Sequence, residues 1–283
     1  MEACFLSSNS FANAIPRTAA VRFQRRGGKA VPCSVPCMCS SSSSPNDDSA
    51  GLPGSADWRS FRARLVATER ELASSRPNKA LSLESVIPAT VGERWAHTIH
   101  EVEKGCLLVA TEKLDGVHIF ERTVILVLST GPIGPTGIIL NRPSLMSMKE
   151  SRSSAYDVTG TFADRELYFG GPIEDGLFLA RGESGREARR SGVAVEVMEG
   201  LYYGRKEGVG CVGEMVRRGV GEVGEFRFFE GCCGWVKGQL SDEVRSGYWT
   251  VVACSQGVIG LGSVGGVGLW DDVLGLLGPK KVW

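Results

Sequence analysis

Short apolar runs, each broken by glycine, proline or asparagine, recur from residue 106 to the C-terminus and limit the folds open to this chain. Most are shorter than a typical helix, and residues 193–197 alternate apolar and other side chains as a half-buried strand requires. The expected strands are 106–110, 124–129, 137–140, 167–169, 177–180, 193–197, 226–229 and 249–254.

Helical spacing is less frequent. Trp58, Phe61 and Leu65 predict an amphipathic helix of about four turns that packs on the main domain. Further helices are expected near 113–119, 213–218, 238–245 and 269–277, whereas the charged, glycine-broken segment 181–191 is expected to be a mobile surface loop. This irregular alternation predicts a single α+β domain with a mixed or curved sheet.

The first 46 residues differ from the rest in composition. They contain five Arg or Lys but one acid, Glu2, and end in a serine run, which is typical of an organelle transit peptide. A disordered tail that stays attached is the alternative. We expect a chloroplast transit peptide at 1–46, a helix and linker at 47–92, and the main domain at 93–283.

Charge and hydropathy exclude some partners. The full chain has 32 basic and 32 acidic residues, of which residues 1–46 contain five and one. Without that segment 27 basic and 31 acidic residues remain, so the mature protein is mildly acidic. Basic doublets such as Arg189 and Arg190 keep a nucleic-acid partner open as an alternative. The acidic residues between these doublets and the mildly acidic charge of the mature protein disfavour it. No apolar run approaches the ~18 residues of a membrane span, so we expect a soluble protein without a membrane partner.

The stretch FRFFEGCCGWVKGQL, residues 226–240, raises the question of thiol chemistry. One hypothesis makes Cys232 or Cys233 a low-pKa, redox-responsive thiol. The other predicts a structural corner, in which a strand ends, residues 231–234 form a tight turn, Trp235 fills the corner and Gln239 lies in the next helix. The odd number of mature cysteines, five, suits a reducing compartment.

Other motifs give weaker signals. The GLGSVG at 260–265 matches a dinucleotide fingerprint, but the chain ends before the required βαβ unit. His97 and His100 lack a convincing third metal ligand. Asn141 and Arg142 follow a glycine-rich loop and could hold an anion, although they could equally end a strand, with Arg142 pairing with a carboxylate. We therefore predict no catalytic residue, cofactor or metal.

Four blocks together resemble the AlgH/YqgE-like family: GCLLVATEKLDGVHIFERTVILVLS, GPTGIILNRPS, YFGGPIEDGLFLARG and FRFFEGCCGWVKGQLSDEV. The resemblance covers about 105–278 and implies an α+β fold with a curved, partly barrel-like sheet surrounded by helices. It also implies a plant plastid homologue of bacterial proteins associated with transcriptional regulation, with no agreed catalytic residue or cofactor. The matching signature residues are Asn141, Arg142, Pro143, Gly170, Gly171, Pro172, Gly231, Gly234, Trp235, Gln239 and Leu240; Cys232 and Cys233 depart from the usual bacterial pattern.

Three functional hypotheses follow. The first is a nonenzymatic binding or regulatory protein of the chloroplast stroma that acts through a protein partner. The second is the redox-responsive protein that uses Cys232 or Cys233. The third is a binder or enzyme for a small anionic molecule at the Asn141 and Arg142 loop, together with the turn at Gly170 and Gly171.

Overall fold

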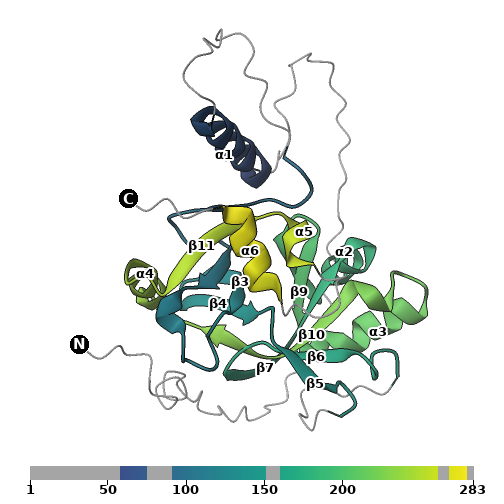
Figure 1. Cartoon of the computed structure of the whole chain (residues 1–283). Coiled ribbons are helices and arrows are strands. Elements are labelled where there is room, and N and C mark those ends of the chain that lie inside the picture. The colour runs from purple at the N-terminus through teal and green to yellow at the C-terminus, as the bar shows by residue number, and fades with distance from the viewer. Residues whose placement is uncertain (1–57, 75–90, 151–159, 261–267, 279–283) are drawn as a thin grey trace, which may run out of the picture. The chain divides into compact units, whose positions relative to one another are not determined.

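The structure, a computed structural model, describes residues 58–74, 91–150, 160–260 and 268–278 (Figure 1). The expected transit peptide at 1–46 and most of the glycine motif at 260–265 lie outside the described residues.

One sheet of eleven strands forms the centre of the described chain. Its main path runs β1-β11-β2-β3-β4-β10-β7-β9-β8, and β5 and β6 attach beside β10. All strand pairs are antiparallel except β6 with β10, which confirms an α+β fold with a mixed sheet. The strands are β1 (Ala96–Thr98), β2 (Leu107–Ala110), β3 (Val124–Gly131), β4 (Gly134–Ile139), β5 (Pro143–Ser147), β6 (Glu166–Phe169), β7 (Ile173–Arg181), β8 (Ala194–Met198), β9 (Leu201–Arg205), β10 (Phe226–Gly234) and β11 (Trp249–Cys254).

The sheet curves around one of two apolar cores. Ala96 of β1 and Met198 of β8, from the two ends of the strand path, are buried in the same cluster. Phe226 and Phe228 of β10 enter the second cluster, whereas Phe229 enters the first, because successive side chains of a strand point to opposite faces. The curved sheet predicted for this chain is confirmed.

Helices cover both cores. They are α1 (Trp58–Ser74), α2 (Gly182–Arg190), α3 (Val209–Arg217), α4 (Gln239–Arg245), α5 (Gln256–Ile259) and α6 (Leu269–Leu277), with 3₁₀ turns η2 (Glu112–Leu114), η3 (Lys206–Gly208) and η4 (Val223–Glu225). In the yellow C-terminal part of Figure 1, α5 and α6 bury Ile259 and Val273 in the first core. None of the described helices is both long and apolar enough to span a bilayer.

The loop predicted at 181–191 is wrong, because these residues form α2. Ser184, Gly185 and Ala188 are buried, and a Cβ on Gly185 would lie 2.3 Å from the ring of Tyr202. The glycine thus permits a helix to lie close to the sheet. Strands β1, β5 and β9 were not expected, and the helix expected at 113–119 is only the short turn η2.

The N-terminal helix α1 forms where its spacing predicts, but its orientation differs. Trp58, Phe61 and Leu65 are exposed, whereas Ala63 is buried. The helix contacts the rest of the chain through Ala63 and through arginine side chains such as Arg59 and Arg62. The prediction that this helix packs on the main domain is therefore confirmed, although its large apolar side chains face away from that contact.

Candidate binding cleft beside the last strand of the sheet

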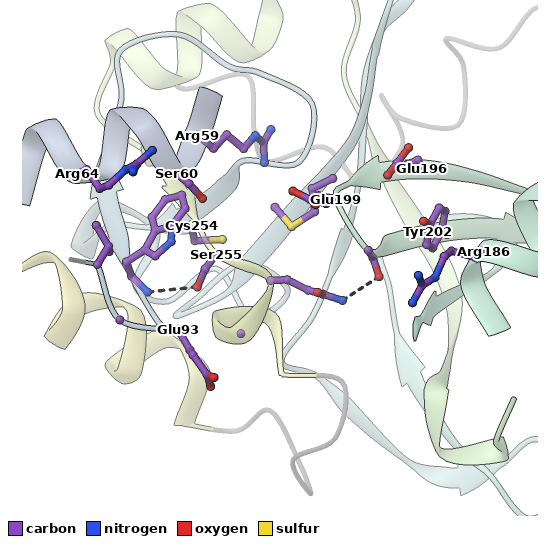
Figure 2. A pocket seen from close by; sticks show the side chains of 17 residues that line it. Arg59, Ser60, Arg64, Glu93, Arg186, Glu196, Glu199, Tyr202, Cys254 and Ser255 are labelled. Carbon is purple, nitrogen blue, oxygen red and sulfur yellow. Dashed lines mark hydrogen bonds between the residues drawn. The ribbon is translucent and has the colours of Figure 1, made fainter. Parts of the chain in front are cut away.

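A cleft of about 990 Å³ lies among α1, α2, the segment before β1 and the turn between β8 and β9 (Figure 2). Its walls come from parts of the chain far apart in sequence. They include Arg59, Arg64, Trp95, Arg186, Met198, Tyr202, Cys254 and Gln256. The curvature of the sheet brings these segments together.

A second hollow of about 520 Å³, here called the edge groove, runs along β8. Six consecutive residues, 194–199, line it with Lys104 and Arg189. Glu196, Met198 and Glu199 also line the cleft, so the two hollows adjoin and share these three wall residues. Together they form one elongated binding surface.

Strand β8 presents its outer edge to this groove. It ends the strand order, and within the described part of the chain it pairs with β9 alone. Near the end of β8 the chain at Gly105 lies close, because a Cβ on Gly105 would be 3.1 Å from the carbonyl oxygen of Val197. Backbone groups along the unpaired part of such an edge are available to another strand. Val195, the second residue of β8, is 52% exposed.

Polar contacts hold α1 beside the cleft. Arg59 donates from Nη1 to the carbonyl of Gly105 over 3.0 Å and from Nη2 to the carbonyl of Lys104. Arg62 Nη2 donates to Glu103 Oε1 over 2.6 Å, and Arg62 Nε donates to His97 Nε2 over 3.1 Å. Because Nε2 accepts this bond, it carries no proton.

The electrostatics of His97 agree with that arrangement. Burial, reinforced by the charges of Arg62 and Arg70, lowers the pKa of His97 from 6.5 to about 4. The imidazole is therefore neutral at physiological pH. His97 thus acts as an acceptor for Arg62.

Two hydrogen bonds fix the floor of the cleft, as Figure 2 shows. Gln256 Nε2 donates to the carbonyl of Gly200 over 2.8 Å, and the backbone N–H of Trp95 donates to Ser255 Oγ over 3.2 Å. The Cys254 thiol is buried in this wall, and burial raises its pKa to about 12. It is therefore unsuited to act as a nucleophile at neutral pH.

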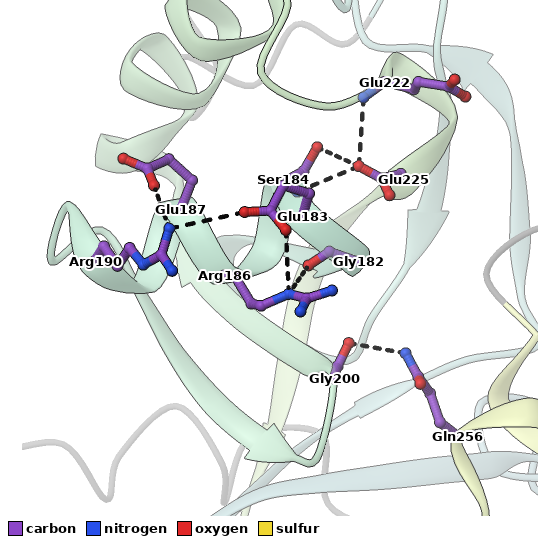
Figure 3. A network of polar contacts seen from close by, with 10 residues as sticks. All are labelled: Gly182, Glu183, Ser184, Arg186, Glu187, Arg190, Gly200, Glu222, Glu225 and Gln256. Carbon is purple, nitrogen blue, oxygen red and sulfur yellow. Dashed lines mark hydrogen bonds and ion pairs between the residues drawn. The ribbon is translucent and has the colours of Figure 1, made fainter.

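Helix α2, which carries Arg186 on the cleft wall, is fastened by the polar network in Figure 3. Ser184 Oγ donates to Glu225 Oε2, which also accepts the backbone N–H of Glu222 over 3.3 Å. Arg186 Nε lies 3.4 Å from Glu183 Oε2. The Ser184 bond ties the start of α2 to η4.

The charges of the cleft are balanced. Three arginines, Arg59, Arg64 and Arg186, share its lining with three glutamates, Glu93, Glu196 and Glu199. In the edge groove, Arg189 Nη1 pairs with Glu196 Oε2 over 2.6 Å. The cleft lining therefore has no net charge that would favour a strongly anionic ligand over a neutral one, whereas Lys104 and Arg189 add two positive charges in the edge groove.

Asn141 and Arg142 fasten a loop and do not line the cleft. Asn141 Oδ1 accepts the backbone N–H of Val124 over 3.0 Å, and its Nδ2 donates to the carbonyl of Arg122 over 2.8 Å. Arg142 Nη2 donates to the carbonyl of Glu121, so its partner is a main-chain group and not the carboxylate that was expected. Both residues hold the segment before β3 against the end of β4.

Gly170 and Gly171 lie at a close backbone crossing with β10. A Cβ on Gly170 would lie 2.2 Å from the carbonyl oxygen of Gly231, and one on Gly171 would lie 2.3 Å from the carbonyl carbon of Cys232. The Gly170 N–H donates to the carbonyl of Glu230 over 2.7 Å. Only glycine allows this approach without displacement of the chain.

The tight turn predicted at 231–234 is wrong, because β10 continues to Gly234. The strand has an irregularity between Glu230 and Cys232 and then pairs with β4, where Cys233 lies opposite Gly137. A β-bulge is the usual consequence of an extra residue in a strand. The glycines of this segment thus allow β10 to pass close to Gly171 and to pair with β4, where a reversal of the chain direction was expected.

The two adjacent thiols are not the low-pKa groups that a redox role requires. Burial, with a smaller contribution from Asp175, raises the pKa of Cys232 to about 11. Cys233 is buried, its thiol lies 3.7 Å from the carbonyl of Gly170, and burial raises its pKa further. Both thiols are expected to be unreactive at neutral pH.

Trp235 fills the corner before α4, as the sequence predicts. Its indole Nε1 donates to Glu243 Oε2 over 2.9 Å, Trp249 Nε1 donates to the same oxygen over 3.0 Å, and Gln239 Nε2 donates to Glu243 Oε1 over 2.9 Å. Sequence reasoning missed Glu243 and Trp249. The separation of four residues between Gln239 and Glu243 on one helix was the available signal.

The model of the AlgH-like (DUF179) family matches residues 107–281, more than half of the chain. The chain belongs to the AlgH-like family. The AlgH-like region therefore spans β2 to α6, whereas α1 and β1 precede it.

Relatives of this AlgH-like chain include bacterial proteins named UPF0301 protein. The one from Chlorobium luteolum is 34% identical over 152 residues, which is 51% of this chain and 71% of the relative. The one from Streptomyces avermitilis is 30% identical over 182 residues, 60% of this chain and 84% of the relative.

Two solved structures are similar. A crystal structure of a Corynebacterium diphtheriae protein shares 26% identity, with a TM-score of 0.48, over 61% of this chain and 86% of its own. The solution structure of the AlgH protein from Pseudomonas aeruginosa shares 20% identity, with a TM-score of 0.48, over 62% of this chain and 89% of its own.

The cleft combines AlgH-like and preceding segments. Met198 and Gln256 lie inside the matched region, whereas Arg59 and Trp95 precede it. The signature residues lie elsewhere, between β4 and β5, at the crossing on β10 and at the corner before α4. Among the described residues, no group of three or more His, Cys, Asp or Glu side chains is placed to hold a metal ion.

Proposed function

We propose that this AlgH-like protein is a nonenzymatic binding protein that holds an extended segment of a protein partner along the outer edge of β8. The observation that carries the proposal is that the edge groove along β8 adjoins the cleft and shares Glu196, Met198 and Glu199 with it. An elongated groove beside a terminal strand fits a chain-like ligand better than a compact metabolite.

Main-chain hydrogen bonds supply affinity when a peptide adds to an exposed sheet edge, and adjacent pockets supply specificity. Strand β8 supports this mode because its outer edge has no described strand partner and its second residue, Val195, is exposed. We therefore expect a ligand with apolar side chains at alternate positions, one of which packs on Val195.

The balanced charges of the cleft support a neutral or mixed-charge segment over a small anion. Arg59 is already bonded to the carbonyls of Lys104 and Gly105, which reduces its availability to an anion. The raised pKa values of Cys232 and Cys254 likewise give no support to thiol catalysis.

A defined peptide tests this function. Random peptides of about ten residues, a length suited to strand addition, are selected by display on the full-length protein, and each resulting peptide is synthesised and titrated by fluorescence anisotropy. Val195→Lys places a charge on the exposed side chain of this edge strand and is expected to weaken binding roughly tenfold or more. Val195→Thr keeps the β-branch and is the matched control, with affinity close to that of the wild type.

Selection of peptides that bind with alternating apolar residues, and that lose affinity in Val195→Lys only, supports the proposal. Failure to select a binding peptide contradicts it. Equal affinity of both variants for every selected peptide also contradicts it.

We also propose that the protein works in the chloroplast stroma, with a regulatory role exerted through the bound partner. The arginine- and serine-rich composition of residues 1–46 supports the location. The regulatory role is supported by the association with transcriptional regulation that the resemblance to bacterial AlgH/YqgE-like proteins implies.

A further inference from the structure

The outer face of α1 carries large apolar side chains that are directed away from its attachment to the rest of the chain. Trp58, Phe61, Leu65 and Leu72 are 62%, 42%, 47% and 49% exposed. Trp58 and Phe61 stack with ring centroids 5.6 Å apart. Exposed apolar stripes of this kind commonly mark interaction surfaces.

The stripe follows the seven-residue spacing of a helix-packing seam. Trp58, Leu65 and Leu72 are separated by seven residues and occupy one seam position, whereas Phe61 and Thr68 occupy the other, three residues later. Residues at these two positions line one side of a helix and fit between those of a second helix. The natural occupant is therefore another helix.

Charge divides α1 into two unlike halves. The half before Val66 contains Arg59, Arg62 and Arg64, and the half after it contains Glu69 and Glu71 with a single base, Arg70. A second copy of the helix in the opposite direction would place basic residues beside acidic ones, whereas a parallel copy would place like charges together. The helix is thus complementary to an antiparallel copy of itself.

We propose that α1 pairs with α1 of a second copy of this chain, antiparallel and centred on Val66 and Ala67. In this register Phe61 packs on the partner's Leu72, and Leu65 packs on the partner's Thr68. Arg64, which flanks the seam, lies beside the partner's Glu71. Twofold symmetry forms each contact twice, as an isologous dimer requires.

Among the residues that the structure describes, the attachment of α1 to its own chain leaves this face open. Arg59 and Arg62 contact the carbonyl of Gly105 and the carboxylate of Glu103, and Ala63 is buried on the same side. The seam lies on the other side of the helix. Dimer formation and the polar contacts of α1 are therefore compatible.

The size of the helix sets the strength of the dimer. Its 17 residues extend about 25 Å at about 1.5 Å per residue. One helix pair of this length is small for a protein interface, so we expect a reversible dimer with a dissociation constant in roughly the micromolar range. Arg64 lines the cleft as well as flanking the seam, whereas Phe61 and Leu65 are outside the cleft lining, so substitutions at these two residues separate the pairing from peptide binding at β8.

Sedimentation velocity of the full-length protein, from roughly 1 to 200 µM, tests the proposal. The wild type is expected to shift from monomer to dimer across this range. The double variant Phe61→Gln and Leu65→Gln is expected to stay monomeric, whereas Ile133→Gln, at an 88% exposed isoleucine on the β3–β4 turn, dimerises like the wild type. Far-ultraviolet circular dichroism that matches the wild type shows that each variant is folded.

Charge reversal tests the antiparallel register. Arg64→Glu and Glu71→Arg are each expected to weaken the dimer roughly fivefold or more, because like charges then meet twice. The double variant Arg64→Glu with Glu71→Arg is expected to restore dimer formation. A wild type that stays monomeric throughout the range overturns the proposal, as does a dimer unaffected by the seam substitutions or a charge-reversed pair that fails to recover.

Discussion

The indole Nε1 of Trp235 donates a hydrogen bond of 2.9 Å to the buried carboxylate of Glu243, which joins the end of β10 to α4. Trp249 donates to the same carboxylate oxygen from β11. Because each partner lies on a different element, this carboxylate fixes the strand, the helix and the following strand relative to one another. The tryptophan of the family signature thus has a structural role here.

Trp235→Phe keeps the aromatic ring but removes one of the donors to Glu243. We expect the free energy of unfolding to fall by about 1–3 kcal/mol, because a buried charged acceptor loses a hydrogen bond. Urea denaturation monitored by circular dichroism measures the change. Val236→Ala, at a neighbouring exposed side chain, should change stability little, and a Trp235→Phe protein as stable as wild type contradicts this role.

Gly231→Ala tests the backbone crossing. The added Cβ would lie 2.0 Å from the carbonyl oxygen of Gly171, and Gly231 has φ = 82°. Gly192→Ala is a matched control, because Gly192 has φ = 74° and no atom within 4 Å of the added Cβ. Urea denaturation should show a loss of about 1 kcal/mol for the control and about 3 kcal/mol or more at the crossing. Equal losses would show that the close approach is unimportant.

Cys232 should react slowly with iodoacetamide. Its pKa of about 11 leaves little thiolate at neutral pH, so alkylation near pH 7.5 should be at least roughly tenfold slower than that of free cysteine. Mass spectrometry after timed quenching measures the rate, with the exposed Cys211 as an internal comparison. A rate at Cys232 equal to or above that of free cysteine contradicts the structural assignment and favours redox sensing.

Because the pKa of His97 is lowered in the folded protein, we expect the free energy of unfolding to fall in mild acid. Its pKa is about 4 in the folded protein and near 6.5 when unfolded, so the unfolded chain binds a proton first as the pH falls. The stabilising contribution is complete above about pH 6.5 and disappears towards pH 4, with a total of about 3 kcal/mol at most. His97→Gln should flatten the unfolding free energy in this window relative to His100→Gln, and an unchanged pH profile contradicts the account.

Residues 1–46 are expected to direct import into chloroplasts. A fusion of this segment to green fluorescent protein, expressed in plant cells, should colocalise with chlorophyll fluorescence. The same segment with its five basic residues replaced by glutamine is the control and should remain outside. Fluorescence of the unaltered fusion in another compartment contradicts the proposed location.

The strands that the sequence predicts are those with compact apolar runs, such as 124–129 and 249–254, because burial on both faces leaves a continuous apolar pattern. The helix α2 could not be predicted in this way, since Gly185 permits close packing on Tyr202 but has the appearance of a loop residue. The extension of β10 to Gly234 was likewise not predicted, because Gly231 and Gly234 are typical of a turn. In the structure Gly231 instead allows the chain to pass close to Gly171. Local spacing does not distinguish these uses of glycine.

The corner at Trp235 was predictable, because the signature places an aromatic residue between a strand and a helix. The binding surface was not. Arg59, Lys104, Val195 and Gln256 are separated widely in sequence, and no motif links them. Their proximity results from the curvature of the sheet, which depends on all strand pairs together.

The central claim is that a partner segment occupies the outer edge of β8, and hydrogen–deuterium exchange of the full-length protein tests it most directly. Exchange is measured with and without a peptide obtained by the selection described above. We predict slower exchange of backbone amides in residues 194–198, because the added strand bonds to that edge. Unchanged exchange there, with protection confined to another part of the chain, would contradict the claim.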